Sequence, residues 1–365
     1  MQDMRIHILG VGNIGCIVAH AIKSLPKPPN VSLLLHKQVA IDQLKANGGI
    51  RLNNSDGSSV LQNGFDYELV NPISDKKLEY GIIDKLIVAC KTTSILAALS
   101  SISHRLRRNS SVCIIHNGDG VMEKIECDLF DKGNDERMPT LIAGLTDHAG
   151  YQKSRYNVEY VSRGRLILGV YTDFNNMQSK INRVLDSDNQ TDTSQMLYQS
   201  LATSQETKNT GELIKLLYDA NLNTQICTLA KEQYERQLKL CFNSAINPLT
   251  ALLMCRNGEL VENDSYKIIL HGVVKEFCHL MNHLYPEKEN QFIKEEMIRL
   301  TENVASVTRM NKSSMRQDIE AGRVTEIDFI NKVLCERAAS HGLTLPLNQL
   351  LLELIKSKEN LNTGI

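Results

Sequence analysis

Apolar and polar positions follow two different patterns along the chain, and the change between them divides it. Up to residue 229, short apolar runs at 5–9, 31–35 and 84–90 alternate with helical patterns and turns, which predicts the buried strands of a parallel sheet. From residue 230 onward glycine is sparse and apolar residues recur every three or four positions, which predicts helices. We therefore expect an α/β domain at 1–229 and an all-helical domain at 230–365.

A glycine-rich turn joins the first predicted strand to the first predicted helix. Its first glycine permits a tight turn, its second lets the backbone approach a pyrophosphate, and its third allows close packing of helix on strand. The start of the following helix also favours phosphate charge. This arrangement predicts a Rossmann-type dinucleotide-binding domain. The turn reads Gly10, Val11, Gly12, Asn13, Ile14 and Gly15.

The end of the second predicted strand bears on the choice of cofactor. An NAD site usually offers an acidic residue to the ribose hydroxyls at this point. Here the strand ends in His36 and Lys37, and no acidic residue follows until Asp42. Lys37 therefore suits the 2′-phosphate of NADP, although an exposed loop lysine is the alternative.

Polar residues and glycines follow three further apolar runs, at 84–90, 111–115 and 140–144. The carboxyl ends of parallel strands lie at one edge of a sheet, where ligands bind. We expect these residues to line one crevice, although each alone is typical of an ordinary turn. They are Lys91, Asn117, Thr146, His148 and Gly150.

Two polar stretches interrupt the first domain. Residues 44–80 contain turn signals, including Asp56-Gly57, and additional strands are plausible there. Residues 171–211 are rich in Asn, Gln, Ser, Thr and Asp, and we interpret them as a partly disordered surface insertion. A last edge strand is expected at 222–228.

Three polar residues in the helical domain share one helix face. Lys239, Asn243 and Asn247 are spaced i, i+4, i+8, and an ammonium with two carboxamides suits a small, oxygen-rich anion. The alternative is a solvated polar stripe. Pro248 disfavours helical geometry at Asn247, so we expect the helix to break or kink there.

Two later motifs have both structural and functional interpretations. Ser314 with Gln317 fits a capping box, and Thr325 with Glu326 fits an N-cap followed by a first-turn acid. Both also lie in the half of the chain that must provide a partner for the nucleotide domain.

Glu276, His279 and His283 lie on one helix face, as metal ligands can. Because no fourth ligand is evident, we expect no metal.

Composition narrows the class of protein. The net charge is −1 and no basic run dominates, so nucleic-acid binding has no support. The nine cysteines form no Cys-x-x-Cys pair, which indicates reduced thiols in a reducing compartment. No apolar run reaches the length of a membrane span, and a strand beginning by residue 5 leaves no room for a targeting peptide. We expect a cytoplasmic protein without a membrane partner.

From about residue 5 to 355, the insertion excepted, the chain resembles the ketopantoate reductases (2-dehydropantoate 2-reductases). The most specific motifs are Ile246-Asn247-Pro-Leu-Thr-Ala, Asn257-Gly-Glu-Leu, Ser313-Ser314-Met-x-Gln317-Asp-Ile, and Thr325-Glu326-Ile-Asp328 with Asn331. The resemblance implies an NADPH-dependent oxidoreductase that reduces 2-dehydropantoate to pantoate in pantothenate and coenzyme A biosynthesis.

The resemblance also implies a role for individual residues. Lys239 matches the family's proton-donating lysine, and Glu326 matches a glutamate beside this lysine and the cofactor. Ser314 and the asparagines Asn243, Asn247 and Asn257 match substrate-contacting residues. On the cofactor side, the matches are residues 10–15, Lys91, Asn117, which also lies near the substrate, and Gly150. Many relatives have an arginine where this chain has His36-Lys37.

Two other functions fit the same sequence. One is another dehydrogenase with a Rossmann and a helical domain, of the hydroxyisobutyrate or 6-phosphogluconate type. The other is a catalytically inactive relative that serves as a regulatory binding protein. The expected partner is a small 2-keto acid, and the sequence leaves a monomer and a homodimer equally open.

Overall fold

The computed structural model divides into two compact units. The first comprises Met1–His116 and Met122–Gln233, and the second comprises Asn117–Val121 and Tyr234–Ile365. The boundary expected between residues 229 and 230 falls where helix α8 (Leu229–Leu253) begins. The structure describes residues 4–70, 81–130, 138–172, 177–185, 193–202, 204–286 and 292–363.

The first unit is built on an eight-stranded sheet with the order β12-β11-β8-β7-β6-β1-β2-β5. Its neighbouring strands are parallel except for the antiparallel pair β8 and β11. The α/β fold expected from the apolar runs is therefore confirmed. The strands are β1 (Arg5–Leu9), β2 (Asn30–Leu35), β5 (Asp66–Leu69), β6 (Lys85–Val88), β7 (Ser111–Ile115), β8 (Thr140–Thr146), β11 (Leu166–Val170) and β12 (Thr224–Ile226).

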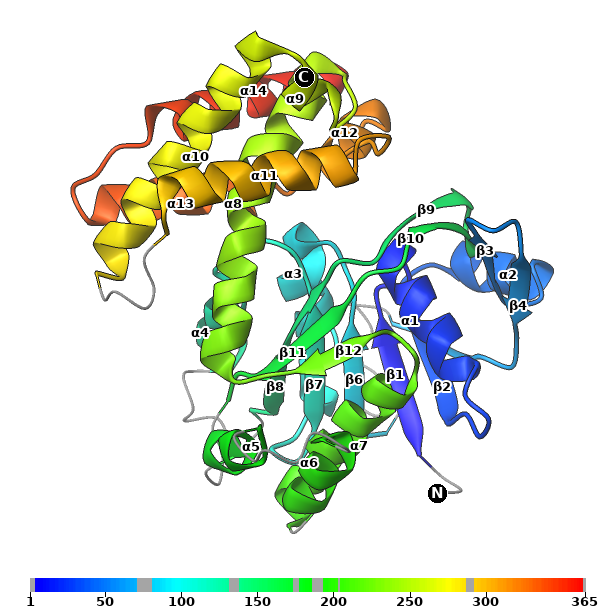
Figure 1. Ribbon diagram of the computed structural model, residues 1–365. Helices are drawn as coiled ribbons and strands as arrows, with labels where there is room; N and C mark the ends of the chain where they lie inside the picture. Colours follow the sequence, from blue (N-terminus) through cyan, green and yellow to red (C-terminus); the bar gives the residue numbers. More distant parts are fainter. Residues whose placement is uncertain are drawn as a thin grey trace. The chain divides into compact units, whose positions relative to one another are not determined.

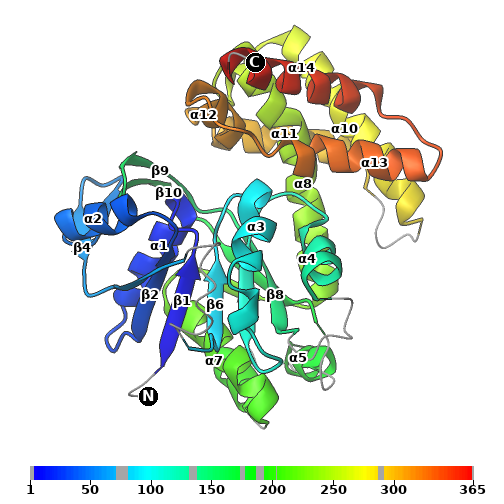
Figure 2. The same ribbon diagram turned by 180° about the vertical axis from the view of Figure 1, so that it is seen from behind.

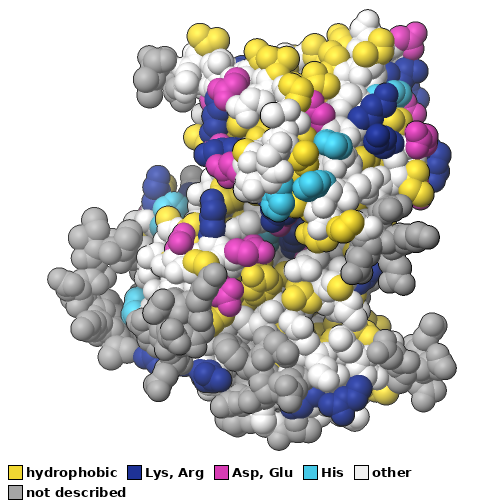
Figure 3. Space-filling view, turned by 90° about the vertical axis from the view of Figure 1, so that its left-hand side faces the viewer, with side chains coloured by type: hydrophobic (Ala, Val, Ile, Leu, Met, Phe, Trp, Pro, Cys, Tyr) yellow, Lys and Arg dark blue, Asp and Glu magenta, His cyan; other side chains and the backbone are white. Residues whose placement is uncertain are grey.

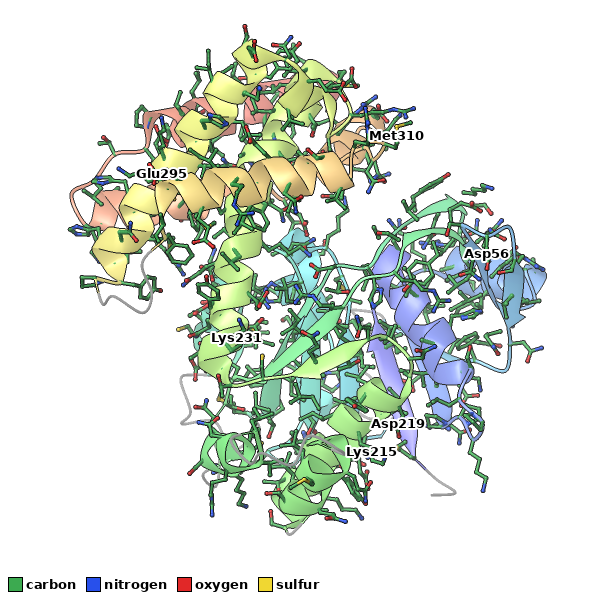
Figure 4. All side chains as sticks on the ribbon, in the orientation of Figure 1. Asp56, Lys215, Asp219, Lys231, Glu295 and Met310 are labelled. Atoms are coloured by element: carbon green, nitrogen blue, oxygen red, sulfur yellow. The ribbon has the colours of Figure 1, made fainter. Side chains whose placement is uncertain are left out.

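Helices cover both faces of this sheet. Figures 1 and 2 show α1 (Asn13–Lys23) and α7 (Gln205–Asp219) on one face and α3 (Ile95–Ser100) on the other. A buried ion pair of 2.7 Å between Lys85 on β6 and Glu212 fixes α7 to the sheet. On the outer side of α7, Lys215 and Asp219 form an i, i+4 ion pair (Figure 4). Helices α2 (Gln38–Ala46) and α4 (Val121–Phe130) lie in the same part of the chain.

A second, four-stranded sheet has the order β4-β3-β10-β9. The turn predicted at Asp56-Gly57 joins β3 (Ile50–Asn54) to β4 (Ser59–Gln62), and Figure 4 labels Asp56 in this turn. Gly57 has a φ of +85°. The partners β9 (Ala149–Ser154) and β10 (Asn157–Ser162) come from far along the chain. The hairpin at 50–62 was predictable, but its pairing with β10 was not.

The described residues of the predicted insertion at 171–211 are mostly helical. They form α5 (Met177–Leu185), α6 (Thr193–Leu201) and the start of α7. Met177, Ile181, Leu197 and Leu201 are almost completely buried, so the segment presents sparse apolar positions to the core at the i, i+4 spacing of a helix. Residues 173–176, 186–192 and 203 lie outside the described part. The predicted edge strand at 222–228 is confirmed as β12.

The regular secondary structure in the described part of the second unit consists of helices, as predicted. Its core includes Phe277 and Cys278, and Phe292 packs edge-on against Phe277 at 5.6 Å between ring centroids. After α8 come α9 (Glu259–Glu262), α10 (Asp264–Leu284), α11 (Lys294–Val307), α12 (Ser314–Glu320), a 3-10 turn (Ile327–Phe329), α13 (Asn331–Ser340) and α14 (Pro346–Thr363).

Helix α8 does not break at Pro248, contrary to the prediction, but runs on to Leu253. A proline removes the hydrogen bond to the carbonyl four residues earlier, here that of Ser244. The fully buried side-chain amide of Asn331 donates to this carbonyl at 2.9 Å and also to Asn348 Oδ1 at 2.9 Å. The helix therefore continues because a side chain from α13 replaces the missing backbone donor.

A buried carboxylate joins three strands of the first unit. Glu68 on β5 accepts hydrogen bonds from His7 on β1, Ser32 on β2 and the Arg105 guanidinium. Burial acts to raise the pKa of Glu68, but the hydrogen bonds from His7 and Arg105 and their charges outweigh it and lower the pKa to about 2.

On the face drawn in Figure 3, Lys and Arg side chains lie among Asp and Glu side chains. No helix among the described residues is both long and apolar enough to span a bilayer. All nine cysteines are unbridged, and Cys16, Cys113, Cys241, Cys255 and Cys278 are buried.

Replacing Asn331 with Ala should destabilise α8 by about 1–3 kcal/mol, because the buried Ser244 carbonyl loses its donor. Hydrogen exchange of the α8 amides measures this local free energy of opening. In a Pro248→Ala background, residue 248 regains an N–H that can bond Ser244, so the same substitution should cost less. Equal costs in both backgrounds would show that Asn331 does not compensate for the proline.

Glu68 should make the first unit sensitive to acid. Because its pKa is lowered on folding from 4.5 to about 2, its stabilising contribution is complete above pH 4.5 and is lost as the pH falls toward 2. Thermal unfolding measured across this range should show a flatter pH dependence for Glu68→Gln than for the wild type. The variant should also be less stable at neutral pH, where the wild-type carboxylate is charged and paired.

Candidate functional site

The glycine turn after β1 is held so tightly that two of its glycines admit no side chain. Gly10 has a φ of +91°, and a Cβ there would lie 2.5 Å from the Cys90 backbone nitrogen. A Cβ on Gly15 would lie 2.0 Å from the Gly10 carbonyl oxygen. The close helix-to-strand packing predicted from the motif is therefore present in the structure.

Gly12 has open space around it instead. A Cβ at this position would meet nothing within 4 Å, and Gly12 is the N-cap of α1 without a side-chain capping bond. The first N–H groups of a helix have no acceptor within it, and α1 has no acidic residue in its first turn. The open space at Gly12, the free backbone N–H groups and the positive end of the helix dipole are together suited to binding the pyrophosphate of a dinucleotide.

A residue that the sequence analysis missed supports this turn. The Gln152 backbone N–H on β9 donates to Asn13 Oδ1 at 3.1 Å, and its side-chain amide donates to the Val11 carbonyl at 3.3 Å. The Cys16 thiol donates to the same carbonyl at 3.7 Å. The two Gln152 contacts join positions that are 139 and 141 residues apart in sequence, and no local pattern marks Gln152.

Three residues predicted for the crevice have clear structural roles. His148 uses both ring nitrogens, one with the Leu222 carbonyl and the other with the Gly164 N–H and the Tyr160 hydroxyl. Thr146 donates its hydroxyl to the Arg165 carbonyl. A Cβ on Gly150 would lie 2.7 Å from the Glu159 carbonyl and 3.3 Å from an Ile17 side-chain carbon, so packing requires a glycine there.

The two lysines predicted for the cofactor side lie at strand ends and are exposed. Lys37 follows β2 and is the N-cap of α2, and Lys91 follows β6 and precedes a short 3-10 turn. Burial and the positive charges of Lys37 and Arg155 lower the pKa of His36. The end of β2 is therefore a positively charged environment.

In the second unit, Lys239, Asn243 and Asn247 share one face of the continuous helix α8. Lys239 and Asn243 are partly buried, and Asn247 is only 6% exposed. Among the described residues, the side chains of Asn243 and Asn247 form no hydrogen bond with the protein. A buried amide that is not bonded within the protein is suited to binding a polar ligand.

The structure also brings together Asn117 and Glu326, which lie 209 positions apart: the Asn117 amide donates to the Glu326 carboxylate at 3.4 Å. The loop that carries Asn117 is fixed to the 3-10 turn after Glu326. The Asp119 N–H donates to the Phe329 carbonyl, and Asp119 forms a 2.5 Å ion pair with Arg337 on α13. Gly118, at a φ of +76°, leaves no space for a Cβ beside the Phe329 carbonyl.

Buried Arg236 on α8 completes this arrangement by donating to the Gly118 carbonyl at 3.3 Å. No sequence pattern marks either Arg236 or Arg337 as a residue of the site. Both lie in segments with a helical pattern, and such a pattern does not indicate which residue a charged side chain will contact.

Ser314 is not part of a capping box, contrary to the structural interpretation of its motif. The N-cap of α12 is Ser313, whose hydroxyl oxygen accepts from the Arg316 N–H and from Thr250. Gln317 bonds to the Lys312 carbonyl instead. Ser314 is exposed, and its hydroxyl forms no hydrogen bond with the described residues.

Asn257, Thr325 and Glu326 have local structural roles. Asn257 donates to the Thr308 hydroxyl at 2.8 Å, and its Oδ1 is buried without a hydrogen bond. The Thr325 hydroxyl accepts from the Ile327 N–H, as expected of a capping residue. Glu326 is the N-cap of the 3-10 turn rather than a residue of its first turn.

On the helix face that carries Glu276, His279 and His283, Glu276 has a structural role. The Glu276 carboxylate accepts hydrogen bonds from the Leu347 and Asn348 N–H groups at the start of α14. Within the ranges that the structure describes, no group of three or more His, Cys, Asp or Glu residues could hold a metal ion.

Two family models match the chain in succession. "Ketopantoate reductase PanE/ApbA" matches residues 6–173, and "Ketopantoate reductase PanE/ApbA C terminal" matches residues 232–359. The chain belongs to the ketopantoate reductase family. The family resemblance stated from the sequence motifs is thereby confirmed.

Individual members of the ketopantoate reductase family align over nearly the whole chain. A "Probable 2-dehydropantoate 2-reductase" of Schizosaccharomyces pombe is 27% identical over 370 residues, which cover 99% of this chain and 98% of the relative. The 2-dehydropantoate 2-reductase of Pyrococcus horikoshii is 28% identical over 361 residues and 99% of both chains.

Solved structures confirm the fold. D-mandelate dehydrogenase with NADH and anilino(oxo)acetate has a TM-score of 0.76 at 20% identity and covers 99% of both chains. The 2-dehydropantoate 2-reductase of Geobacter metallireducens has a TM-score of 0.72 at 18% identity, covering 97% of this chain and 99% of that one.

The different surroundings of the glycines give a test of the nucleotide site. Gly12→Ala should leave the fold intact but weaken NADPH binding by about tenfold or more, because its methyl group would occupy the space beside the helix start. Gly15→Ala should lower thermal stability even without a nucleotide, because its Cβ overlaps the Gly10 carbonyl. Calorimetry of both variants with and without NADPH separates the two effects, and unimpaired NADPH binding by Gly12→Ala would exclude Gly12 from the site.

Proposed function

We propose that the protein catalyses the NADPH-dependent reduction of 2-dehydropantoate (ketopantoate) to pantoate, a step of pantothenate and coenzyme A biosynthesis. Membership of the ketopantoate reductase family is the observation that carries this proposal. It is supported by the polar face of α8, where Asn243 and Asn247 have unused amides beside Lys239. A cytoplasmic location remains a prediction, and the oligomeric state remains open between monomer and homodimer.

Reduction of a 2-keto acid requires a hydride, a proton for the developing alkoxide and a hold on the carboxylate. Bound NADPH would supply the hydride. In our proposal the protonated Lys239 amine lies against the ketone oxygen, stabilises the negative charge that grows there and then donates its proton to it. Half-burial of Lys239 supports this role, because exclusion of water strengthens the interaction of its charge with the substrate.

Glu326 would position both the Lys239 ammonium and the substrate hydroxyl. Its contact with the Asn117 amide supports this role, because a carboxylate with a hydrogen-bond donor on one oxygen is restricted in orientation. The bonds of Asp119 to Phe329 and Arg337 would hold Asn117 and Glu326 in register. Asn117 thus acts next to both cofactor and substrate in this proposal.

The substrate's oxygens would be bound by Asn243, Asn247, Asn257 and Ser314. The exposed hydroxyl of Ser314 and the unused amides of Asn243 and Asn247 support this assignment. Asn257 already donates to Thr308, but its buried Oδ1 is available to accept a hydrogen bond. Each such group that remained unpaired in a closed site would cost about 1–3 kcal/mol.

For the cofactor, we assign the pyrophosphate to residues 10–15, the 2′-phosphate to Lys37, and further contacts to Lys91, Asn117, Gly150 and Glu326. The open space at Gly12 and the exposed position of Lys37 support these assignments. The packing role of Gly150 is compatible with its assignment, because a larger residue would displace β9 beside the glycine turn.

A substrate panel tests the proposed function. Purified protein should oxidise NADPH with ketopantoate much faster than with phenylglyoxylate or with the aldehyde to which 3-hydroxyisobutyrate is oxidised, and NADPH should be preferred to NADH. A clear preference for an aromatic 2-keto acid would overturn the proposed substrate. No turnover with any of them, despite NADPH binding, would favour the inactive regulatory relative.

Lys239→Ala should reduce turnover by roughly 10²–10⁴-fold, the usual contribution of a positioned general acid, with nearly normal NADPH affinity. Exposed Lys231, on the same helix (Figure 4), provides the matched control, and Lys231→Ala should retain normal rates. The rates come from single-turnover kinetics and the affinities from titration with NADPH. Near-normal turnover of Lys239→Ala would remove this lysine from the mechanism.

A further inference from the structure

The 2′-phosphate is the group that distinguishes NADPH from NADH. Lys37 alone would bind this phosphate with little selectivity. A lysine binds phosphate as a point charge, whereas the planar guanidinium of an arginine can form two parallel hydrogen bonds. Neither residue at the end of β2, His36 or Lys37, provides such a group. An arginine on another element that packs near the end of β2 could supply such a group.

Arg155, in the turn between β9 and β10, is held against helix α2. Its backbone carbonyl accepts a hydrogen bond from the Asn47 amide at 2.7 Å, and its guanidinium donates to Gln43 Oε1 at 3.3 Å. The next residue, Tyr156, has a φ of +64° and is 1% exposed, and its carbonyl accepts from the Arg51 N–H on β3. The backbone of Arg155 and of the residue after it is thus anchored.

Electrostatics support the same location. Burial, Lys37 and Arg155 all lower the pKa of His36, at the end of β2. Burial raises the pKa of the Cys16 thiol to about 12, and the Arg155 charge opposes this rise. The hydrogen bonds with Asn47 and Gln43 place Arg155 against α2, the helix whose N-cap is Lys37.

In the described part of the chain, neither Lys37 nor Arg155 forms an ion pair with a carboxylate. The nearest acidic residue in sequence after Lys37, Asp42, accepts a hydrogen bond from Gln38 instead. Strand β9 also carries Gln152, which supports the glycine turn, so the hairpin contacts both the glycine turn and α2.

We propose that Arg155 is the specificity-determining residue for NADPH: its guanidinium would bind the 2′-phosphate together with Lys37. The inference rests on the proposed function, which it deepens by naming the residue that selects the cofactor. The Gln43 contact would keep the guanidinium positioned before the cofactor binds, which limits the entropy lost on binding.

Binding of NADPH and NADH to the full chain, measured by isothermal titration calorimetry, tests the proposal. Arg155→Gln should weaken NADPH binding by about tenfold or more and leave the dissociation constant of NADH nearly unchanged. Arg155→Lys should fall between this variant and the wild type. Arg163→Gln is the matched control, because it removes the same charge from an exposed arginine over the Tyr160 ring and should alter neither affinity.

The outcomes are distinct from those of the activity assay, because binding requires no keto acid. An unchanged NADPH affinity in Arg155→Gln would overturn the role of Arg155, as would an equal loss for both cofactors. A wild type that binds NADPH no more tightly than NADH would also overturn it, and would leave reduction of ketopantoate with NADH possible. Arg155→Gln could lose the preference for NADPH while the wild type fails to reduce ketopantoate. This result would support the role of Arg155 and contradict the proposed substrate.

Discussion

The hydrogen bond from the Asn331 amide to the Ser244 carbonyl allows one long helix to pass through a proline. Without it, Pro248 would leave a buried carbonyl unpaired in the middle of the second unit's core. Because α8 remains continuous, residues spaced by four along it stay in one row. The proposed catalytic face is therefore a consequence of helix geometry, stabilised by a side chain from α13.

In the first unit, the close approach of backbone segments at the glycine turn is the corresponding constraint. Gly10 and Gly15 allow β1, α1 and the end of β6 to meet without side chains between them, and Gln152 fixes the turn from β9. Only Gly12 faces open space. The glycine motif thus has two separable functions. Gly10 and Gly15 allow the close packing that the fold requires, and Gly12 leaves open space for a ligand.

Local patterns predicted much of this structure, and long-range contacts explain what they missed. The strands, the glycine turn, the edge strand at 222–228 and the α8 face followed from periodicity and turn chemistry. The effect of Pro248 was wrong because its compensation comes from Asn331, 83 residues later in the chain. The helices at 177–201 were missed because each buries only a few apolar residues, and polar composition concealed their spacing.

The residues of the candidate site also fall into two groups, those that local patterns predict and those that long-range contacts bring in. The motif residues could be named from sequence, whereas Gln152, Arg155, Arg236 and Arg337 could not, since each acts through a partner far away along the chain. An arginine in a turn or a helix is ordinary in sequence. Only the fold shows which strand end or loop it reaches.

The central claim, that this chain reduces ketopantoate at the α8 face, is tested most directly by identifying the product. Purified protein, NADPH and ketopantoate should yield one pantoate for each NADPH oxidised, as quantified by mass spectrometry against authentic pantoate. NADPH that binds but is not consumed, with ketopantoate recovered unchanged, would contradict the account.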